Sequence, residues 1–445
     1  MDNISFKELI CDISLEEDII ILLIESSSDF IISDEDINYI FYWLITDGMF
    51  ENAAIKLIDK YEDKIDPESL SDNNNAILIT ARNFGFKNLA IKLIDIYSNK
   101  LKLKVDYNNT TVLISFCNWE YESVALKLID TFGDKCLPDQ IDNLKNTALI
   151  EACYSGLENI AIKLIDTFGD KCLPDHVTNK KSTALFYACY NKLNNVVIKL
   201  IDIFGDKCRI DQINVNNDTA LISLAYNNMF NIIRKIIKKN GNKYNLEQIN
   251  IANCSIFTHL LCGKNDDLAI EILKLCGDRY NFLHIDDKKY NLLLDACHYQ
   301  TEKFAIILIK KYGDKCGIEQ VNYLNETALI IACKNKLENL AIKLIKKYDD
   351  KCNYNKKNND GKTAYDFATE NNLLKVIELL EYTKIKKIYN YDENKCSICM
   401  NDLNDKHILL VGCGHSCFCF KCSVSIIECA ICKIKIIDRY ELIVK

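Results

Sequence analysis

The chain is poor in proline and glycine, with 3 and 14 of them among 445 residues. These counts leave little room for Pro-rich or Gly-rich linkers. Long apolar runs are missing as well: the longest purely aliphatic one covers residues 19–24, far short of the roughly 20 residues that a membrane span requires. The first residues lack the charged segment and apolar core of a secretory signal. We therefore expect an intracellular, cytoplasmic protein with reduced thiols.

An excess of basic residues is also absent. The formal net charge is −8 and the sequence pI is about 5.5, which argues against nucleic acid as the main partner. The apolar fraction of 49% is ample for a core. Because 445 residues exceed the size of one hydrophobic core, we expect several domains or a repeat array. The 22 cysteines would suggest disulfides only in a small secreted chain.

One pattern recurs through most of the chain, at a spacing of 36 residues and once of 35. Each unit opens with a segment such as T-A-L-I-I-A-C and continues with one such as L-A-I-K-L-I, both apolar at helical spacing. Such short helices are marginal alone, but stacking gains about 1.5–3 kcal/mol for each buried Leu or Ile. The pattern predicts a mostly α-helical solenoid over residues 40–380. We place the unit starts at Ile40, Ala76, Thr111, Thr147, Thr183, Thr219, Ser255, Asn291, Thr327 and Thr363.

Two flanking segments carry no visible chemistry. Residues 1–39 are acidic and broken by a run of serines, and we interpret them as an N-terminal cap or, alternatively, as a partly disordered tail. Residues 381–395 are polar and contain neither glycine nor proline. We expect them to form a linker that continues the last helix for a turn or two.

The T-A-L-x-x-A-C opening and the helix–turn–helix unit resemble the ankyrin repeat, whose usual signature is T-P-L-H-x-A in about 33 residues. This chain departs from it: the histidine is missing, and about three extra residues follow the second helix in a G-D-K-C connection. Alanine replaces the usual proline, as at Ala148, Ala184, Ala220, Ala328 and Ala364. The connection and the Asn-, Ile- and Lys-rich composition are similar to ankyrin families of giant DNA viruses. That resemblance implies a viral protein in the host cytoplasm.

Cysteine recurs at two positions of the unit, one in the first helix and one in the G-D-K-C connection. The first set is Cys117, Cys153, Cys189, Cys297 and Cys333, and the second is Cys136, Cys172, Cys208, Cys316 and Cys352. The two sets lie 19 residues apart without accompanying histidines. We therefore interpret them as small buried side chains, in preference to a metal or redox ladder.

The ankyrin resemblance implies that partners bind on the concave face and at the loop tips. One column of positions expected there holds Asn118, Tyr154, Tyr190, Tyr226, Cys262, His298 and Lys334. We take Tyr154, Tyr190, Tyr226 and His298 as candidate target-binding residues, because exposed aromatic side chains serve as binding anchors. Alternatively, a tyrosine at this place only covers its neighbour.

Eight cysteines crowd between Cys396 and Cys432, with the spacing C-x2-C, thirteen residues, C-x-H-x3-C-x2-C, six residues, C-x2-C. Cysteines with two residues between them present two thiolates to one tetrahedral zinc, so four half-sites predict two Zn²⁺ ions. Cys417 does not fit, since it would leave four residues before Cys422 instead of two. His407 lies six residues before Cys413 and is excluded by the same spacing.

This spacing resembles the C3HC4 RING finger of inhibitor-of-apoptosis proteins and related ubiquitin ligases, over residues 396–445. The resemblance implies a cross-brace. One Zn²⁺ would be held by Cys396, Cys399, Cys419 and Cys422, and the other by Cys413, His415, Cys429 and Cys432. The alternative is a zinc knuckle without activity.

The same resemblance implies a contact surface for a ubiquitin-conjugating enzyme, formed by Ile398, Ala430 and Lys433. The family usually has proline where this chain has Ala430, and often arginine where it has Lys433. It also implies a homodimer through the tail over residues 434–444.

These features favour a RING-type E3 ubiquitin ligase or adaptor that acts without catalytic residues of its own. The repeats would bind a target protein, and the zinc finger would recruit the conjugating enzyme. The alternative is a non-catalytic scaffold whose RING only dimerises or docks the repeat array. Nucleic-acid binding is disfavoured, because the zinc spacing lacks paired histidines and the chain is acidic.

Overall fold

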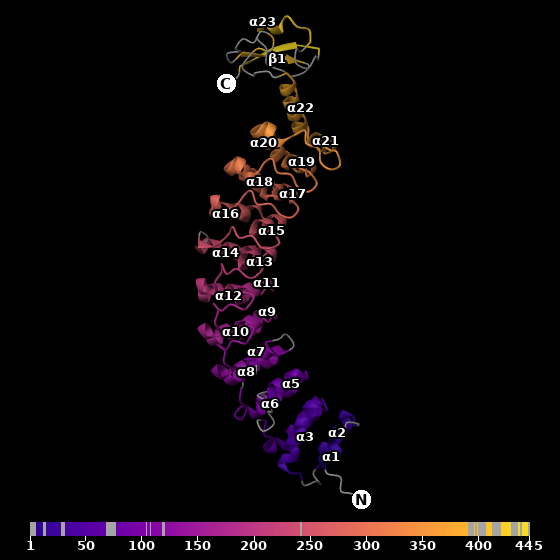
Figure 1. Cartoon of the computed structure of the whole chain (residues 1–445), viewed down its shortest axis with the longest axis vertical. Coiled ribbons are helices and arrows are strands. Elements are labelled where there is room, and N and C mark those ends of the chain that lie inside the picture. Colours follow the sequence, from indigo (N-terminus) through magenta and orange to yellow (C-terminus); the bar gives the residue numbers. More distant parts are fainter. Residues whose placement is uncertain are drawn as a thin grey trace. The chain divides into compact units, whose positions relative to one another are not determined.

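The chain is mostly helical and its helices recur in pairs (Figure 1). The computed structural model describes residues 6–11, 15–27, 32–67, 77–103, 105–106, 108–117, 121–240, 243–389, 396, 398, 406–411, 420–428, 435–436 and 438–443. The helices gather into two compact units, Met1–His259 and Leu260–Lys445. In the described residues each unit consists of stacked helix pairs, and the second unit also contains a small module with a two-stranded sheet. The fold is an α-solenoid followed by a zinc-finger module, as the sequence predicts.

From the repeat at Thr111 onward, the first helix starts directly after the predicted unit start, and in most of these repeats that residue is the helix N-cap. The Oγ1 of Thr147 accepts a hydrogen bond from the N–H of Ile150 at 3.2 Å, and Asn291 caps its helix through Oδ1 at 2.9 Å. The recurring threonine thus supplies an acceptor for otherwise unpaired amides. The first helices are α5 (Ile77–Asn83), α7 (Val112–Phe116), α9 (Ala148–Tyr154), α11 (Ala184–Tyr190), α13 (Ala220–Tyr226), α15 (Ile256–Cys262), α17 (Leu292–His298), α19 (Ala328–Lys334) and α21 (Ala364–Glu370).

The second helices are amphipathic. In one of them Ile160, Ala161 and Leu164 are fully buried, whereas Lys163 reaches Asp130 of the preceding repeat at 2.5 Å on the outside. Burial of one face stabilises helices that would be marginal alone. The second helices are α4 (Glu51–Tyr61), α6 (Lys87–Tyr97), α8 (Glu122–Phe132), α10 (Glu158–Phe168), α12 (Asn194–Phe204), α14 (Phe230–Asn240), α16 (Asp266–Cys276), α18 (Glu302–Tyr312), α20 (Glu338–Tyr348) and α22 (Leu374–Tyr389).

The G-D-K-C connections are short 3₁₀ turns. Their glycine adopts backbone angles closed to other residues, for example φ 51° and ψ −129° at Gly133. The cysteine that follows points inward, and the Sγ of Cys208 donates to the carbonyl of Leu200 at 3.0 Å. All ten recurring cysteines are buried, which confirms the packing interpretation. The G-D-K-C turns are η5 (Gly133–Cys136), η6 (Gly169–Cys172), η7 (Gly205–Cys208) and η10 (Gly313–Cys316). Three further 3₁₀ turns of other sequence follow second helices: η2 (Glu62–Lys64), η9 (Gly277–Arg279) and η11 (Asp349–Cys352).

Neighbouring repeats within a unit are joined by recurring polar contacts. The side-chain amide of Asn191 donates to the carbonyls of Cys153 and Tyr154 in the preceding repeat, at 2.9 and 2.8 Å. The long connections also meet, since the N–H of Val215 donates to the carbonyl of Lys180 at 3.1 Å. These bonds satisfy buried or half-buried backbone groups and fix the lateral register of the repeats.

The N-terminal segment contains helices α1 (Phe6–Ile10), α2 (Glu17–Ser26) and α3 (Asp34–Thr46). The expected division between residues 1–39 and the repeat array falls inside α3, because this helix starts six residues before Ile40. Ser33 sets the earlier start: its Oγ accepts a hydrogen bond from the N–H of Asp36 at 3.1 Å, and the first turn is acidic.

The last repeat helix, α22, runs nine residues into the predicted linker of residues 381–395. The lack of glycine and proline there allows this continuation. In the described ranges, no helix combines the length and the apolar character needed to cross a bilayer.

Candidate functional site

The described part of the zinc module is a small α+β unit. Strand β1 (Lys406–Val411) pairs antiparallel with β2 (Asp438–Ile443), with Lys406 opposite Ile443. Helix α23 (Phe420–Ser423) contacts β1. An isolated bridge joins Glu428 to Lys435. The β1–β2 pairing joins the segment before Cys413 to the segment after Cys432.

Two of the eight predicted zinc ligands lie in the described residues. Cys396 is fully buried, and Cys422 is half-buried on α23. The turn after α23 is closed on the carbonyl of Cys422, which accepts a hydrogen bond from the Oγ of Ser425 at 2.8 Å. Thiols of this kind fit Zn²⁺, which binds thiolate sulfur tightly. The other predicted ligands lie outside the described residues: Cys399, Cys413, His415, Cys419, Cys429 and Cys432.

Elsewhere in the described part of the chain, no three His, Cys, Asp or Glu side chains converge as a metal site.

Of the predicted contact surface for a conjugating enzyme, the described residues include Ile398, which is 40% exposed. Ala430 and Lys433 lie outside the described residues. Two further apolar side chains, Val424 and Ile427, are exposed in the spacer between Cys422 and Cys429. The sequence analysis missed them, although aliphatic residues between two pairs of zinc ligands could have been recognised as candidates for an exposed contact surface. A small module that exposes several aliphatic side chains has the character of a protein-binding surface.

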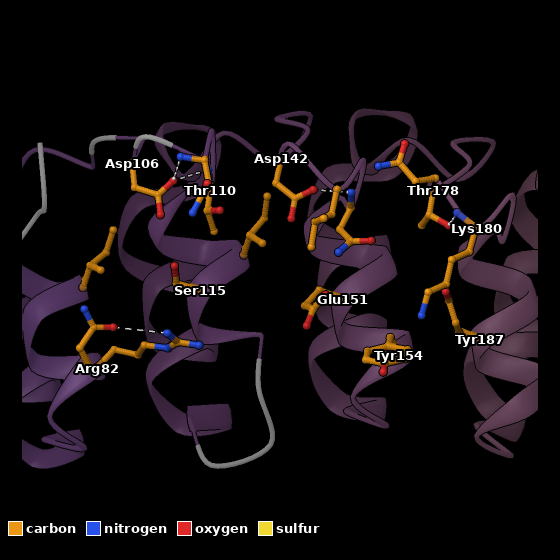
Figure 2. A pocket seen from close by; sticks show the side chains of 17 residues that line it. Arg82, Asp106, Thr110, Ser115, Asp142, Glu151, Tyr154, Thr178, Lys180 and Tyr187 are labelled. Atoms are coloured by element: carbon orange, nitrogen blue, oxygen red, sulfur yellow. Dashed lines mark hydrogen bonds between the residues drawn. The ribbon is translucent and has the colours of Figure 1, made fainter.

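A groove of about 590 Å³ lies in the unit Met1–His259, between the first helices α5, α7, α9 and α11 and the connections that precede three of them (Figure 2). Aspartate side chains close turns in two of these connections. The Oδ1 of Asp106 accepts the N–H groups of Asn108 and Thr110, each at 2.8 Å. The Oδ1 of Asp142 accepts the N–H of Asn146 at 2.6 Å. Both carboxylates line the groove.

Two of the candidate tyrosines line this region. Tyr154 is 54% exposed and lies in the groove, with its ring edge-to-face against Tyr187 of the next repeat at 5.1 Å. A second hollow of about 300 Å³ shares Tyr154, Tyr187 and Lys180 with the first and adds Tyr190. Both interpretations of the column thus hold for Tyr154, which covers a neighbouring ring and still exposes more than half of its side chain.

The other two candidates lie apart from the groove. Tyr226 is exposed and packs edge-to-face on His259, with centroids 5.4 Å apart. His298 is exposed in the unit Leu260–Lys445, where it contacts Tyr290 and Tyr299 at 5.3 and 5.0 Å. Tyr226 lines neither hollow, and His298 belongs to the other unit.

The groove also contains side chains that the sequence analysis did not select, above all Glu151 and Tyr187. Both occupy the fifth position of the unit, one helical turn before the tyrosine column. The sequence does show that this position is unusual. In three successive repeats it holds Ser115, Glu151 and Tyr187, whereas the first positions of these repeats are all threonine.

Glu151 has an unusual electrostatic environment. Burial, with a further contribution from the Asp142 carboxylate, raises the pKa of Glu151 to about 7, and the Arg82 guanidinium opposes this shift. Among the described residues, no side chain or backbone group donates a hydrogen bond to its carboxylate. In Figure 2, Glu151 lies between Arg82 on one side and Lys180 on the other.

The comparisons with known proteins identify the C-terminal module. Residues 392–439 match the family model of the C3HC4-type zinc finger (RING finger). The matched span contains all eight predicted ligands and only about a tenth of the chain. No curated protein matches the chain. The fold and the match together define the class: a mostly helical repeat protein with a zinc-binding RING finger near its C-terminal end. The ankyrin resemblance of the array rests on the repeat pattern and the helix pairs.

Proposed function

We propose that the chain is a RING-type ubiquitin ligase adaptor, in which the repeats hold a target protein and the RING finger recruits a charged ubiquitin-conjugating enzyme. The RING match over residues 392–439 carries this proposal. The exposed Ile398, which sits at the position of the family's hydrophobic contact, supports it. The chain would contribute proximity and orientation of the thioester and the acceptor lysine. No acid, base or nucleophile of its own is required.

Two Zn²⁺ ions would tie the module together. We assign Cys396, Cys399, Cys419 and Cys422 to one ion. We assign Cys413, His415, Cys429 and Cys432 to the other. Because fifty residues bury little apolar surface, metal binding supplies folding free energy, on the order of 10 kcal/mol per site. Zinc thereby positions the loop of Ile398 and has no part in the ubiquitin transfer itself.

Ubiquitin-chain assembly tests the proposal. The full-length zinc-loaded chain is incubated with activating enzyme, ATP, ubiquitin and a panel of conjugating enzymes. Ile398→Ala should lower chain formation at least tenfold while zinc stays at two per chain. Ile285→Ala, which shortens a similarly exposed isoleucine of the repeats outside both hollows, is the matched control and should be neutral. Full activity of Ile398→Ala would sink the assumed contact surface.

A second candidate function is a non-catalytic scaffold. Ala430 and Lys433 favour it, since lysine lacks the planar donor fork of arginine and alanine lacks the rigid ring of proline. In the same assay, absence of chains with every conjugating enzyme, together with intact zinc, would support the scaffold and overturn the ligase. Light scattering on the same sample measures the proposed homodimer through the tail.

We further propose that the target docks on the groove side of the repeats, with Tyr154 and Tyr190 as aromatic anchors. Their exposure and their place beside two adjoining hollows support this proposal. Tyr226 and His298 remain candidates outside these hollows.

A further inference from the structure

The groove contains a half-buried carboxylate beside an exposed aromatic ring. Glu151 and Tyr154 are three residues apart on α9, so their side chains lie on the same helical face. Both line the groove. The ring of Tyr154 is held from one side by Tyr187, edge-to-face at 5.1 Å, and 54% of the side chain stays open. A cation placed here would meet a carboxylate and a fixed aromatic ring together.

The charged form of Glu151 has no pairing partner in the described part of the chain. It lacks a hydrogen-bond donor and an ion-pair partner there, and the nearby Asp142 adds charge of the same sign. The Oδ1 of Asp142 is occupied by a loop amide at 2.6 Å, but its charge remains. Leaving a half-buried carboxylate without a donor costs stability, and a ligand cation removes that cost.

Two basic residues flank the carboxylates of Asp142 and Glu151 in the groove. Figure 2 shows Asp142 and Glu151 between Arg82 and Lys180, which stand on opposite sides of them. The guanidinium of Arg82 also donates to the Oδ1 of Asn83 at 3.4 Å. A single cationic side chain is therefore complementary to the centre, whereas neighbouring basic residues of the same ligand would face Arg82 or Lys180.

We propose that this groove binds an extended segment of the target protein through one lysine or arginine side chain, seated between the Glu151 carboxylate and the Tyr154 ring. This inference deepens the proposed function and rests on the role of the repeats as the target-binding part. The remainder of the segment lies along the second hollow beside Tyr190, which shares Tyr154, Tyr187 and Lys180 with the first.

The test uses the immobilised full-length chain and a displayed library of random twelve-residue peptides. Selected peptides should share one Lys or Arg without basic neighbours. Asp295→Asn is the matched control, because Asp295 occupies the same unit position in the other unit and lies outside both hollows. Selection on Asp295→Asn should return the same peptides, and selection on Glu151→Gln should lose the basic residue.

Affinity measurements then quantify the interaction between Glu151 and the basic residue of the peptide. For one selected peptide, Glu151→Gln and replacement of the peptide's basic residue by glutamine should each weaken binding about tenfold, and the two together little more than either alone. Tyr154→Leu should weaken binding several-fold, because it removes the aromatic ring that faces the cation. Acidic or phosphorylated consensus peptides, additive losses, or absence of any enriched peptide would each overturn the inference.

This experiment contains no conjugating enzyme. If Glu151 and the basic residue of the peptide show no coupling while ubiquitin chains still form, only the binding inference is rejected. If the coupling is observed but no chains form, only the ligase proposal is rejected. Thermal unfolding of each variant shows whether a loss of binding reflects a loss of fold.

Discussion

The side-chain amide of Asn291 donates a hydrogen bond to the carbonyl of Gly317 at 3.0 Å, and the missing side chain of that glycine makes the room for it. A Cβ at residue 317 would lie 2.8 Å from the Asn291 Nδ2. In two repeats with a threonine cap, the position of Gly317 holds Leu137 or Leu173, in the same left-handed conformation. The asparagine cap at residue 291 therefore requires a glycine at residue 317, because the longer side chain of asparagine fills the space of a Cβ there.

This pair predicts a coupled effect on stability. Gly317→Leu should lower the free energy of unfolding by about 1–3 kcal/mol, because the new side chain is strained at φ +62° and collides with Asn291. Adding Asn291→Thr, the cap of other repeats, should recover part of the loss. Denaturant unfolding of the two single variants and the double variant gives a coupling of about 0.5–3 kcal/mol. Strict additivity would contradict the relationship.

Zinc content should depend on the assigned ligands. Cys396→Ser removes a buried ligand thiol and should lower bound zinc below two per chain, with loss of folding in the module. Cys417→Ser is the control, matched in chemistry and close in sequence, and should keep two zinc ions. The measurement is metal analysis of purified full-length protein. Equal zinc loss in both variants would show that the cross-brace assignment needs Cys417.

Stability should depend on pH through Asp295. Burial, with help from Asp286, raises the pKa of Asp295 from 3.8 to about 7. Below pH about 4 the group is protonated in both states. Between pH about 4 and 7 the unfolded chain releases its proton and the folded chain keeps it, so stability falls as the pH rises.

Asp295→Asn removes this dependence. Relative to wild type, the variant should gain on the order of 1–3 kcal/mol between pH 4.5 and pH 8. Asp139→Asn, at an exposed position, should show no such trend. Melting temperatures over this pH range provide the comparison, and a gain that is constant across pH would refute the assignment to Asp295.

Cysteine reactivity should follow burial. Desolvation raises the pKa of the Cys333 thiol to about 12, and Cys189 is also fully buried with a raised pKa. Since the thiolate is the reactive form, iodoacetamide should spare both in the native chain and label the exposed Cys262. Mass spectrometry of tryptic peptides before and after urea unfolding measures this order. Native labelling of Cys189 at the rate of Cys262 would contradict the packing of the array.

The sequence predicted local structure well where hydrogen bonds are local. The recurring Thr147-type residue marks a helix start because its side chain caps amides three residues away. The prediction failed at α3, where Ser33 caps the helix seven residues before Ile40, the unit start that the period indicates. A cap depends on the residue present, whatever the period of the array.

The sequence by itself determined the repeat length, the helix pairs and the ligand spacing of the RING finger, because each depends on residues close along the chain. Only the tertiary structure decided which side chains of different repeats meet. Tyr154 touches Tyr187 across a repeat boundary, and Glu151 is buried near Asp142 and Arg82. Such contacts depend on how neighbouring repeats stack. The asparagine that joins the repeats recurs with the period, at Asn191, Asn227, Asn335 and Asn371, but the partners of its side chain became visible only in the tertiary structure.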